Sequence, residues 1–134
     1  MEGELANPAR VQAQSFESDI PVLSDGRAID LVHLSRQTFG ERDLEAELLR
    51  LFDRQSRQIV DRLTEGPVTE ARWRADLAHT LKGSARAVGA FGVAAAAEAY
   101  ELDARAGADL ARALATLKTS VDAAHAAIGE LLAG

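Results

Sequence analysis

One short stretch of the chain combines residue types that can transfer a phosphoryl group: His79, Lys82, Gly83 and Arg86. Their spacing of i, i+3, i+4 and i+7 places all four on one face of a helix. A neutral imidazole nitrogen is a nucleophile near neutral pH, and a neighbouring ammonium holds a phosphoryl group as a point charge. Glycine costs about 1 kcal/mol relative to alanine on an exposed helix, but it lets another molecule approach the backbone. This face therefore indicates a histidine that exchanges a phosphoryl group with a docked partner.

The motif around this histidine resembles the signature of histidine phosphotransfer (HPt) domains of two-component phosphorelays. Residues 79–85 read His-Thr-Leu-Lys-Gly-Ser-Ala, and Val-Gly-Ala follows at 88–90. The family pattern is roughly His-x-Leu-Lys-Gly-Ser-Ser/Ala and then Leu-Gly. The resemblance continues upstream through residues 29–34 and 48–52, and downstream to about residue 132.

The resemblance implies a role for each residue of this face. It makes Nε2 of His79 the phosphorylated atom and Lys82 the cation that screens the phosphoryl charge. Gly83 would leave space for an incoming receiver domain. Ser84 either belongs to the same docking surface or only packs and hydrogen-bonds backward along the helix. Arg86 replaces the small residue usual in the family, so it is either a plain surface charge or part of a basic docking strip.

A glutamate takes the place of a glutamine that many family members carry on the following helix. In the family this glutamine hydrogen-bonds the ring nitrogen that is not phosphorylated. Counting from His79 through the glycine at 89, Glu101 falls at that position, and Glu98 lies one turn earlier. A carboxylate there would orient the ring and fix its tautomer. The alternatives are a solvated glutamate, or a match shifted by one turn to Glu98.

Composition and charge restrict the class of protein. The 134 residues suggest one domain, and 47% hydrophobic residues are enough for a core. The net charge of −6 argues against nucleic acid as the main partner, and no apolar run is long enough to span a membrane. The absence of cysteine and of an apolar leader fits a cytoplasmic protein. The helix around His79 is locally basic and suits an acidic partner pocket; its cations are Arg72, Arg74, Lys82 and Arg86.

Helical periodicity runs through most of the chain, and no strand-like alternation persists. We expect helices over residues 28–37, 41–64, 70–88, 93–106 and 109–132. Thr69 is the expected cap of the third, Asp109 either caps or starts the fifth, and a turn crosses Gly89 and Gly92. This predicts an all-α fold, an antiparallel four-helix bundle with a short additional N-terminal helix. Residues 1–19 show no sustained period and are expected to form a flexible arm, so that the bundle domain covers residues 20–134.

Two apolar stripes should face the core of this bundle. The helix at 41–64 has its stripe at Leu44, Leu48, Leu51, Phe52, Ile59 and Leu63. The helix at 109–132 has a heptad seam at Leu110, Leu114, Leu117, Val121, Ala124, Ile128 and Leu131.

The sequence gives little support for a metal site, a nucleotide site or a hydrolase site. His33 and His125 are expected to be structural, because His33 sits among apolar neighbours in the short leading helix and His125 is not followed by a Lys-Gly pair. The sequence contains no His-x-x-x-His pair, P-loop, G-x-G-x-x-G or G-x-S-x-G motif. We therefore expect no bound metal and no nucleotide or other cofactor.

The leading hypothesis is a phosphorelay intermediate that accepts a phosphoryl group on His79 from a receiver-domain phospho-aspartate and passes it to another receiver aspartate. The resemblance implies receiver domains and a hybrid histidine kinase as partners, with Mg²⁺ bound in the receiver. The protein would then be a monomeric phosphocarrier and not an enzyme. One alternative is the phosphotransfer domain of a larger hybrid or chemotaxis kinase. Others are a helical interaction adaptor without phosphorylation and a coiled-coil dimer through the last helix.

Overall fold

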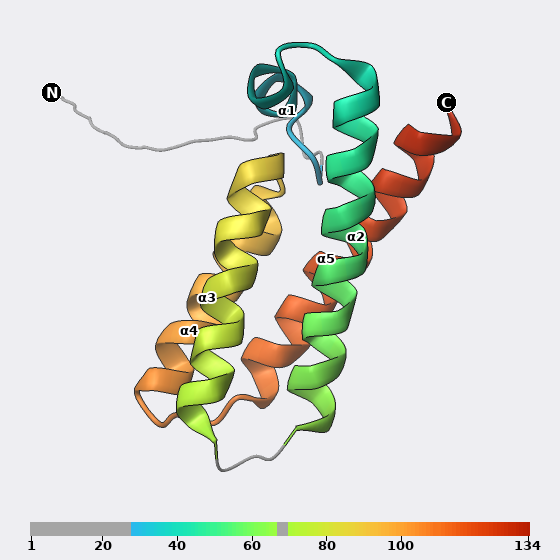
Figure 1. Cartoon of the computed structure of the whole chain (residues 1–134). Coiled ribbons are helices and arrows are strands. Elements are labelled where there is room, and N and C mark those ends of the chain that lie inside the picture. The colour runs from blue at the N-terminus through green and yellow to red at the C-terminus, as the bar shows by residue number, and fades with distance from the viewer. Residues whose placement is uncertain (1–27, 67–69) are drawn as a thin grey trace, which may run out of the picture.

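The computed structural model describes residues 28–66 and 70–134 (Figure 1). Within these ranges the chain forms five helices and no strand, which confirms the predicted all-α class. The predicted arm at 1–19 and the predicted cap at Thr69 lie outside the described residues. No helix in the described ranges is both long and apolar enough to cross a membrane. The helices are α1 (Leu31–Thr38), α2 (Arg42–Glu65), α3 (Ala71–Val88), α4 (Phe91–Arg105) and α5 (Ala111–Ala133).

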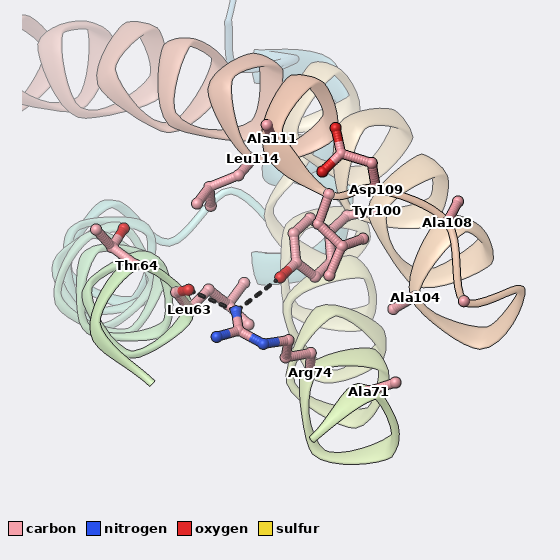
Figure 2. Close-up of a pocket in the computed structure, with 12 residues that line it drawn as sticks. Leu63, Thr64, Ala71, Arg74, Tyr100, Ala104, Ala108, Asp109, Ala111 and Leu114 are labelled. Carbon is pink, nitrogen blue, oxygen red and sulfur yellow. Dashed lines mark hydrogen bonds between the residues drawn. The ribbon is translucent and has the colours of Figure 1, made fainter. Parts of the chain in front are cut away.

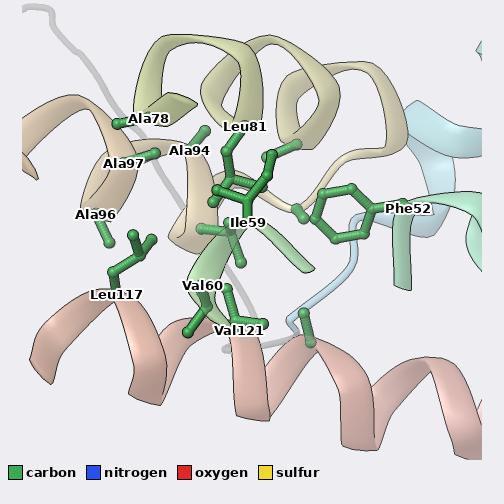
Figure 3. Packing of buried hydrophobic residues seen from close by; sticks show 14 of the residues in the cluster. Phe52, Ile59, Val60, Ala78, Leu81, Ala94, Ala96, Ala97, Leu117 and Val121 are labelled. Atoms are coloured by element: carbon green, nitrogen blue, oxygen red, sulfur yellow. The ribbon is translucent and has the colours of Figure 1, made fainter. Parts of the chain in front are cut away.

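The four long helices contact one another in a closed ring. Helix α2 packs against α3, α3 against α4, α4 against α5, and α5 against α2. Successive long helices run in opposite directions, and α1 lies beside the C-terminal end of α3 (Figure 1). The ring encloses one apolar core, whose labelled members in Figure 3 include Phe52, Ile59, Leu81, Leu117 and Val121.

Helices α3 and α4 have the most extensive contact of any pair. Six of their buried positions are alanines that are at most 4% exposed. Because the distance between helix axes depends on the side chains at the contact, small residues let these two helices approach closely. Because the helices are close, side chains at the edge of the contact can reach from α3 to α4. The alanines are Ala75, Ala78, Ala85, Ala94, Ala97 and Ala104.

The turn between α3 and α4 depends on Gly89. Its φ of 84° is left-handed, and its N–H donates to the carbonyl groups that end α3. The Gly89 carbonyl accepts a 2.9 Å hydrogen bond from the N–H of Asp30, which joins the turn to the start of α1. A Cβ atom on Gly89 would lie 2.8 Å from the Asp30 carbonyl oxygen, so a larger residue would fit neither the backbone angle nor the space. This turn sets the position of α4 along α3.

Three predicted helix starts were wrong by two or three residues, and for α1 a local hydrogen bond explains the difference. Helix α1 begins at Leu31 instead of residue 28, because Asp30 is its N-cap and accepts a hydrogen bond from the His33 N–H. Helix α4 begins at Phe91 instead of residue 93, so Gly92 is helical and the turn needs only Gly89. Helix α5 begins at Ala111 with Leu110, and not Asp109, at the N-cap.

Three leucines of the predicted stripes are exposed: Leu44 (39%), Leu51 (53%) and Leu131 (38%). Leu51 precedes the buried Phe52 by one residue, a rotation of about 100° around the helix that turns it away from the core. Leu44 and Leu131 lie near an outer end of α2 and of α5. The remaining stripe positions are buried or half-buried.

Candidate functional site

His79 lies in the middle of α3 at the edge of the α3–α4 contact. Its side chain is 64% exposed, while the preceding Ala78 is fully buried. The ring nitrogen Nδ1 lies 3.1 Å from Oε2 and 3.3 Å from Oε1 of Glu101 on α4. No described residue makes a hydrogen bond to the other ring nitrogen, Nε2. One side of the imidazole is therefore held by the protein, and the rest of the ring faces outward.

Glu101 is the centre of a charged cluster that joins α3 to α4. Its side chain is only 10% exposed. Lys82 of α3 places Nζ 3.2 Å from Oε1. Arg105 of α4 donates from Nε and NH2 to Oε2, at 3.2 and 3.0 Å. Each carboxylate oxygen thus has a cation of its own in addition to the His79 ring.

These contacts determine the charge of Glu101. Burial by itself raises the pKa of this carboxyl group, but hydrogen bonds from Arg105, Lys82 and His79 outweigh burial and lower the pKa to about 2. At neutral pH the group is therefore an ionised carboxylate, which only accepts hydrogen bonds. It follows that Nδ1 of His79 carries a proton and donates it. In the neutral ring the lone pair then belongs to Nε2, the outward-facing nitrogen.

The structure separates the two glutamates that sequence counting left open. Glu101 contacts the His79 ring, whereas Glu98 pairs with Arg86 through a 3.6 Å contact between Oε1 and NH2. Arg86 and Glu98 are each about half exposed. Arg86 is therefore a surface charge that already has an acidic neighbour.

The residues that follow His79 on α3 form an open face. Gly83 is exposed, and a Cβ atom added there would meet nothing within 4 Å. Ser84 is half-buried on the side of the helix nearer the core. Lys82 directly precedes Gly83, and its side chain is 16% exposed. The imidazole, the ammonium group and the bare backbone at Gly83 thus lie next to one another.

One of the four cations that make this helix locally basic is not part of the surface around His79. Arg74 is only 4% exposed and does not reach the surface near His79. Its NH1 group donates to the carbonyl oxygen of Leu63 and the hydroxyl of Tyr100 (Figure 2). Its NH2 group donates to the carbonyl oxygen of Gly66. Arg74 therefore ties the end of α2 to α3 and α4, beside a pocket of about 450 Å³ that does not include His79.

Sequence reasoning missed two residues of the charged cluster, Arg105 and Asp76. Besides its bonds to Glu101, Arg105 places NH2 3.3 Å from Oδ1 of Asp76 on α3. The signal was present in the sequence, because Arg105 follows Glu101 by four residues and such pairs face each other on a helix. Asp76 precedes His79 by three residues, which places it on the same side of α3.

The other two histidines lie away from this cluster. His33 packs its ring edge-on against Phe91, with 5.1 Å between the ring centroids. His125 of α5 places Nδ1 2.7 Å from Oδ1 of Asp53 on α2. Among the residues that the structure describes, no group of three or more His, Cys, Asp or Glu side chains is arranged to hold a metal ion.

Comparison with known proteins agrees with this geometry. The model of the Hpt domain family matches residues 42–127, more than half of the chain. A similar solved structure is the X-ray structure of a "putative histidine-containing phosphotransfer protein" from rice, with a TM-score of 0.71 and 20% sequence identity over 82% of each chain. At that identity the likeness shows the fold alone. No curated protein matches the sequence significantly.

The family match covers α2, α3 and α4 completely and most of α5, including the whole charged cluster. The chain belongs to the Hpt domain family.

Proposed function

We propose that this protein is a phosphorelay intermediate in which Nε2 of His79 accepts a phosphoryl group from the phospho-aspartate of one receiver domain and passes it to an aspartate of another. The observation that carries the proposal is the ionised, buried carboxylate of Glu101 on Nδ1 of His79. It leaves the lone pair on the ring nitrogen that a partner can reach.

The transfer is balanced without a further reactant. The Nε2 lone pair attacks phosphorus, the bond from phosphorus to the aspartyl oxygen breaks, and the aspartate leaves as a carboxylate. The proton on Nδ1 stays in place, so the phosphorylated ring is cationic and its charge is opposed by Glu101. The reverse sequence of bond changes returns the phosphoryl group to a second aspartate. Because the N–P bond is labile, the phosphohistidine serves transfer and not storage.

The other residues of the face have supporting roles in this proposal. Lys82 screens the phosphoryl charge, because it lies one turn after His79 on the same face of α3. Gly83 lets the receiver backbone approach, since no described atom occupies the space above it. Ser84 and Arg86 lie at the border of the same docking surface. Helices α2 to α5, as an antiparallel four-helix bundle, hold this surface rigid.

In this proposal the receiver domain and this chain supply different groups to the transfer. By analogy with the family, the receiver domain brings Mg²⁺ and its own aspartate, while this chain provides a nucleophile, a cation and a docking surface. In this proposal the protein acts as a monomeric phosphocarrier without catalytic activity of its own. A hybrid histidine kinase would supply the phosphoryl group through its receiver domain.

The direct test measures transfer from a panel of receiver domains carrying a radiolabelled phosphoryl group to the wild-type chain, to His79→Gln and to His125→Gln. The His125 variant is a matched control, because its ring also has a carboxylate on Nδ1 but no lysine three residues later. We expect label that is labile in acid and stable in base on the wild type and on His125→Gln, and none on His79→Gln. Circular dichroism should show the same helix content in all three.

Other outcomes would contradict the proposal. Equal labelling of His79→Gln and the wild type would place the phosphoryl group elsewhere. If no receiver labels the chain and His79→Gln still binds the same partners as the wild type, the protein is a helical adaptor in which His79 has no chemical role.

A further inference from the structure

Arg105 touches the candidate site from outside the His-x-x-Lys-Gly motif. It makes two hydrogen bonds to Oε2 of Glu101 and a third contact to Asp76. Its side chain is 46% exposed, whereas that of Glu101 is 10% exposed. Arg105 therefore covers the buried carboxylate on the side that faces solvent.

The two cations around Glu101 bind different oxygens. Lys82 contacts Oε1 at 3.2 Å, and Arg105 contacts Oε2 at 3.0 Å. The His79 ring lies nearer to Oε2, the oxygen that Arg105 holds. If Lys82 turned toward a phosphoryl group on Nε2, Glu101 would keep Arg105 as its counter-ion. Without Arg105, Lys82 would be the only cation left on a mostly buried carboxylate.

We infer that Arg105 is a positioning residue: it holds Glu101 against Nδ1 of His79 and neutralises it, which releases Lys82 for the phosphoryl group. The release of Lys82 for a phosphoryl group rests on the proposed function. The positioning and neutralisation of Glu101 concern the unphosphorylated protein alone. The groups involved are His79, Lys82 and Asp76 on α3, and Glu101 and Arg105 on α4.

The presence of a glutamate explains why such a residue is needed. A neutral glutamine can accept the Nδ1 hydrogen bond without adding charge. A carboxylate adds a negative charge next to an incoming phosphoryl dianion, and like charges at this range repel. Arg105 supplies a positive charge to this carboxylate through two hydrogen bonds to Oε2, and needs no movement of Lys82.

The test is a cycle of four proteins: wild type, Arg105→Ala, Glu101→Gln and the double variant, with Arg105→Lys as the conservative replacement. In the unphosphorylated proteins, NMR records the ring nitrogens of His79 and the carboxyl carbon of residue 101 against pH. His125 is an internal control in every spectrum, since Asp53 and not Glu101 contacts its ring. In Arg105→Ala we expect Glu101 to titrate at higher pH and Nδ1 of His79 to be protonated in a smaller fraction of molecules. The His125 signals should stay unchanged.

The rate of phosphoryl transfer from a receiver domain is measured on the same set of proteins. We expect Arg105→Ala to slow transfer from a receiver by about tenfold, the size of coupling found within one charged network, and Arg105→Lys to restore part of the loss. In the Glu101→Gln background the same change should have little effect, because Arg105 acts through the carboxylate.

Two results would overturn the inference. Unchanged ring and carboxyl signals in Arg105→Ala would show that Arg105 does not position Glu101. An equal loss of rate in the Glu101→Gln background would show that Arg105 contacts the receiver directly. If no receiver transfers to His79 at all, the proposed function fails, while the NMR half of the cycle still decides the positioning role.

Discussion

The ammonium group of Lys82 lies 3.2 Å from Oε1 of Glu101, and both side chains are mostly buried at the contact between α3 and α4. Lys82 is therefore a partner of the residue that orients the histidine, in addition to being a neighbour of the histidine itself. Its positive charge stabilises the ionised carboxylate before any phosphoryl group arrives. The two functions that we propose for Lys82 follow one another, first on Glu101 and then on the phosphoryl group.

Replacing Lys82 by alanine should slow phosphoryl transfer and leave the fold intact. We expect the transfer rate to fall on the order of ten- to a hundredfold. This decrease is smaller than the one that follows removal of a preorganised donor from a fully enclosed site, because Lys82 must first leave Glu101. Quenched-flow measurement with a labelled receiver gives the rate. Lys118→Ala, in α5, is the control and should transfer at the wild-type rate. Equal rates in both variants would remove Lys82 from the mechanism.

The low pKa of Glu101 predicts a pH dependence of stability. The carboxyl group has a pKa of about 2 in the folded chain and an ordinary pKa of 4.5, so the unfolded chain binds more protons between these values. Stability from Glu101 is therefore complete above about pH 5 and is lost as the pH falls toward 2. Because Arg105 and His79 are exposed to solvent screening, we expect a loss of about 1–2 kcal/mol, less than the full shift implies.

Urea unfolding of the wild type and Glu101→Gln between pH 2 and 6 measures this contribution. The difference in unfolding free energy between the two proteins should shrink as the pH decreases, since glutamine does not titrate. A difference that stays constant over this range would mean that Glu101 is not held in its charged form by its neighbours.

Much of this architecture was predictable from periodicity. The spacing of apolar residues predicted five helices and no strand, and the His-x-x-Lys-Gly spacing predicted that His79, Lys82 and Gly83 share one helix face. Both depend on local geometry, which a helix repeats along its length. The position of Glu101 beside His79 depended on the length of the turn at Gly89, and counting through that turn left Glu98 open as an alternative.

The rest depended on contacts between helices. Arg72, Arg74, Lys82 and Arg86 look alike as cations in the sequence, yet Arg74 is buried and bonded to backbone carbonyls, and Arg86 is paired with Glu98. Arg105 was overlooked because its importance comes from Asp76 on a different helix as well as from its own neighbour four residues earlier. The environment of each arginine depends on which side of its helix faces a neighbouring helix. A single sequence gives this information only indirectly.

The turn that positions α4 gives a test of the fold itself. Gly89→Ala should destabilise the protein by roughly 2–4 kcal/mol, because alanine opposes the left-handed φ and its Cβ would meet the Asp30 carbonyl oxygen. Gly107→Ala is the matched control: its φ of 71° is also left-handed, but a Cβ there meets nothing within 4 Å. We expect that variant to lose only about 1–2 kcal/mol. Thermal or urea unfolding that gives the same loss for both would show that the contact with Asp30 contributes nothing.

The last prediction separates stability from function at Gly83. Both Gly83 on α3 and Gly129 on α5 lie inside exposed helix segments, and a Cβ atom at either position meets nothing within 4 Å. Replacement by glutamine, a better helix former, should therefore stabilise the protein by about 0.5–1 kcal/mol in each case. Only Gly83→Gln should also slow transfer from a receiver, because its side chain fills the space that the partner backbone needs beside His79. Urea unfolding and transfer rates measured on the same preparations test both halves. If Gly83→Gln is stabilised and transfers as fast as Gly129→Gln, the receiver does not approach over this face of α3, and the docking surface must be sought on another side of His79.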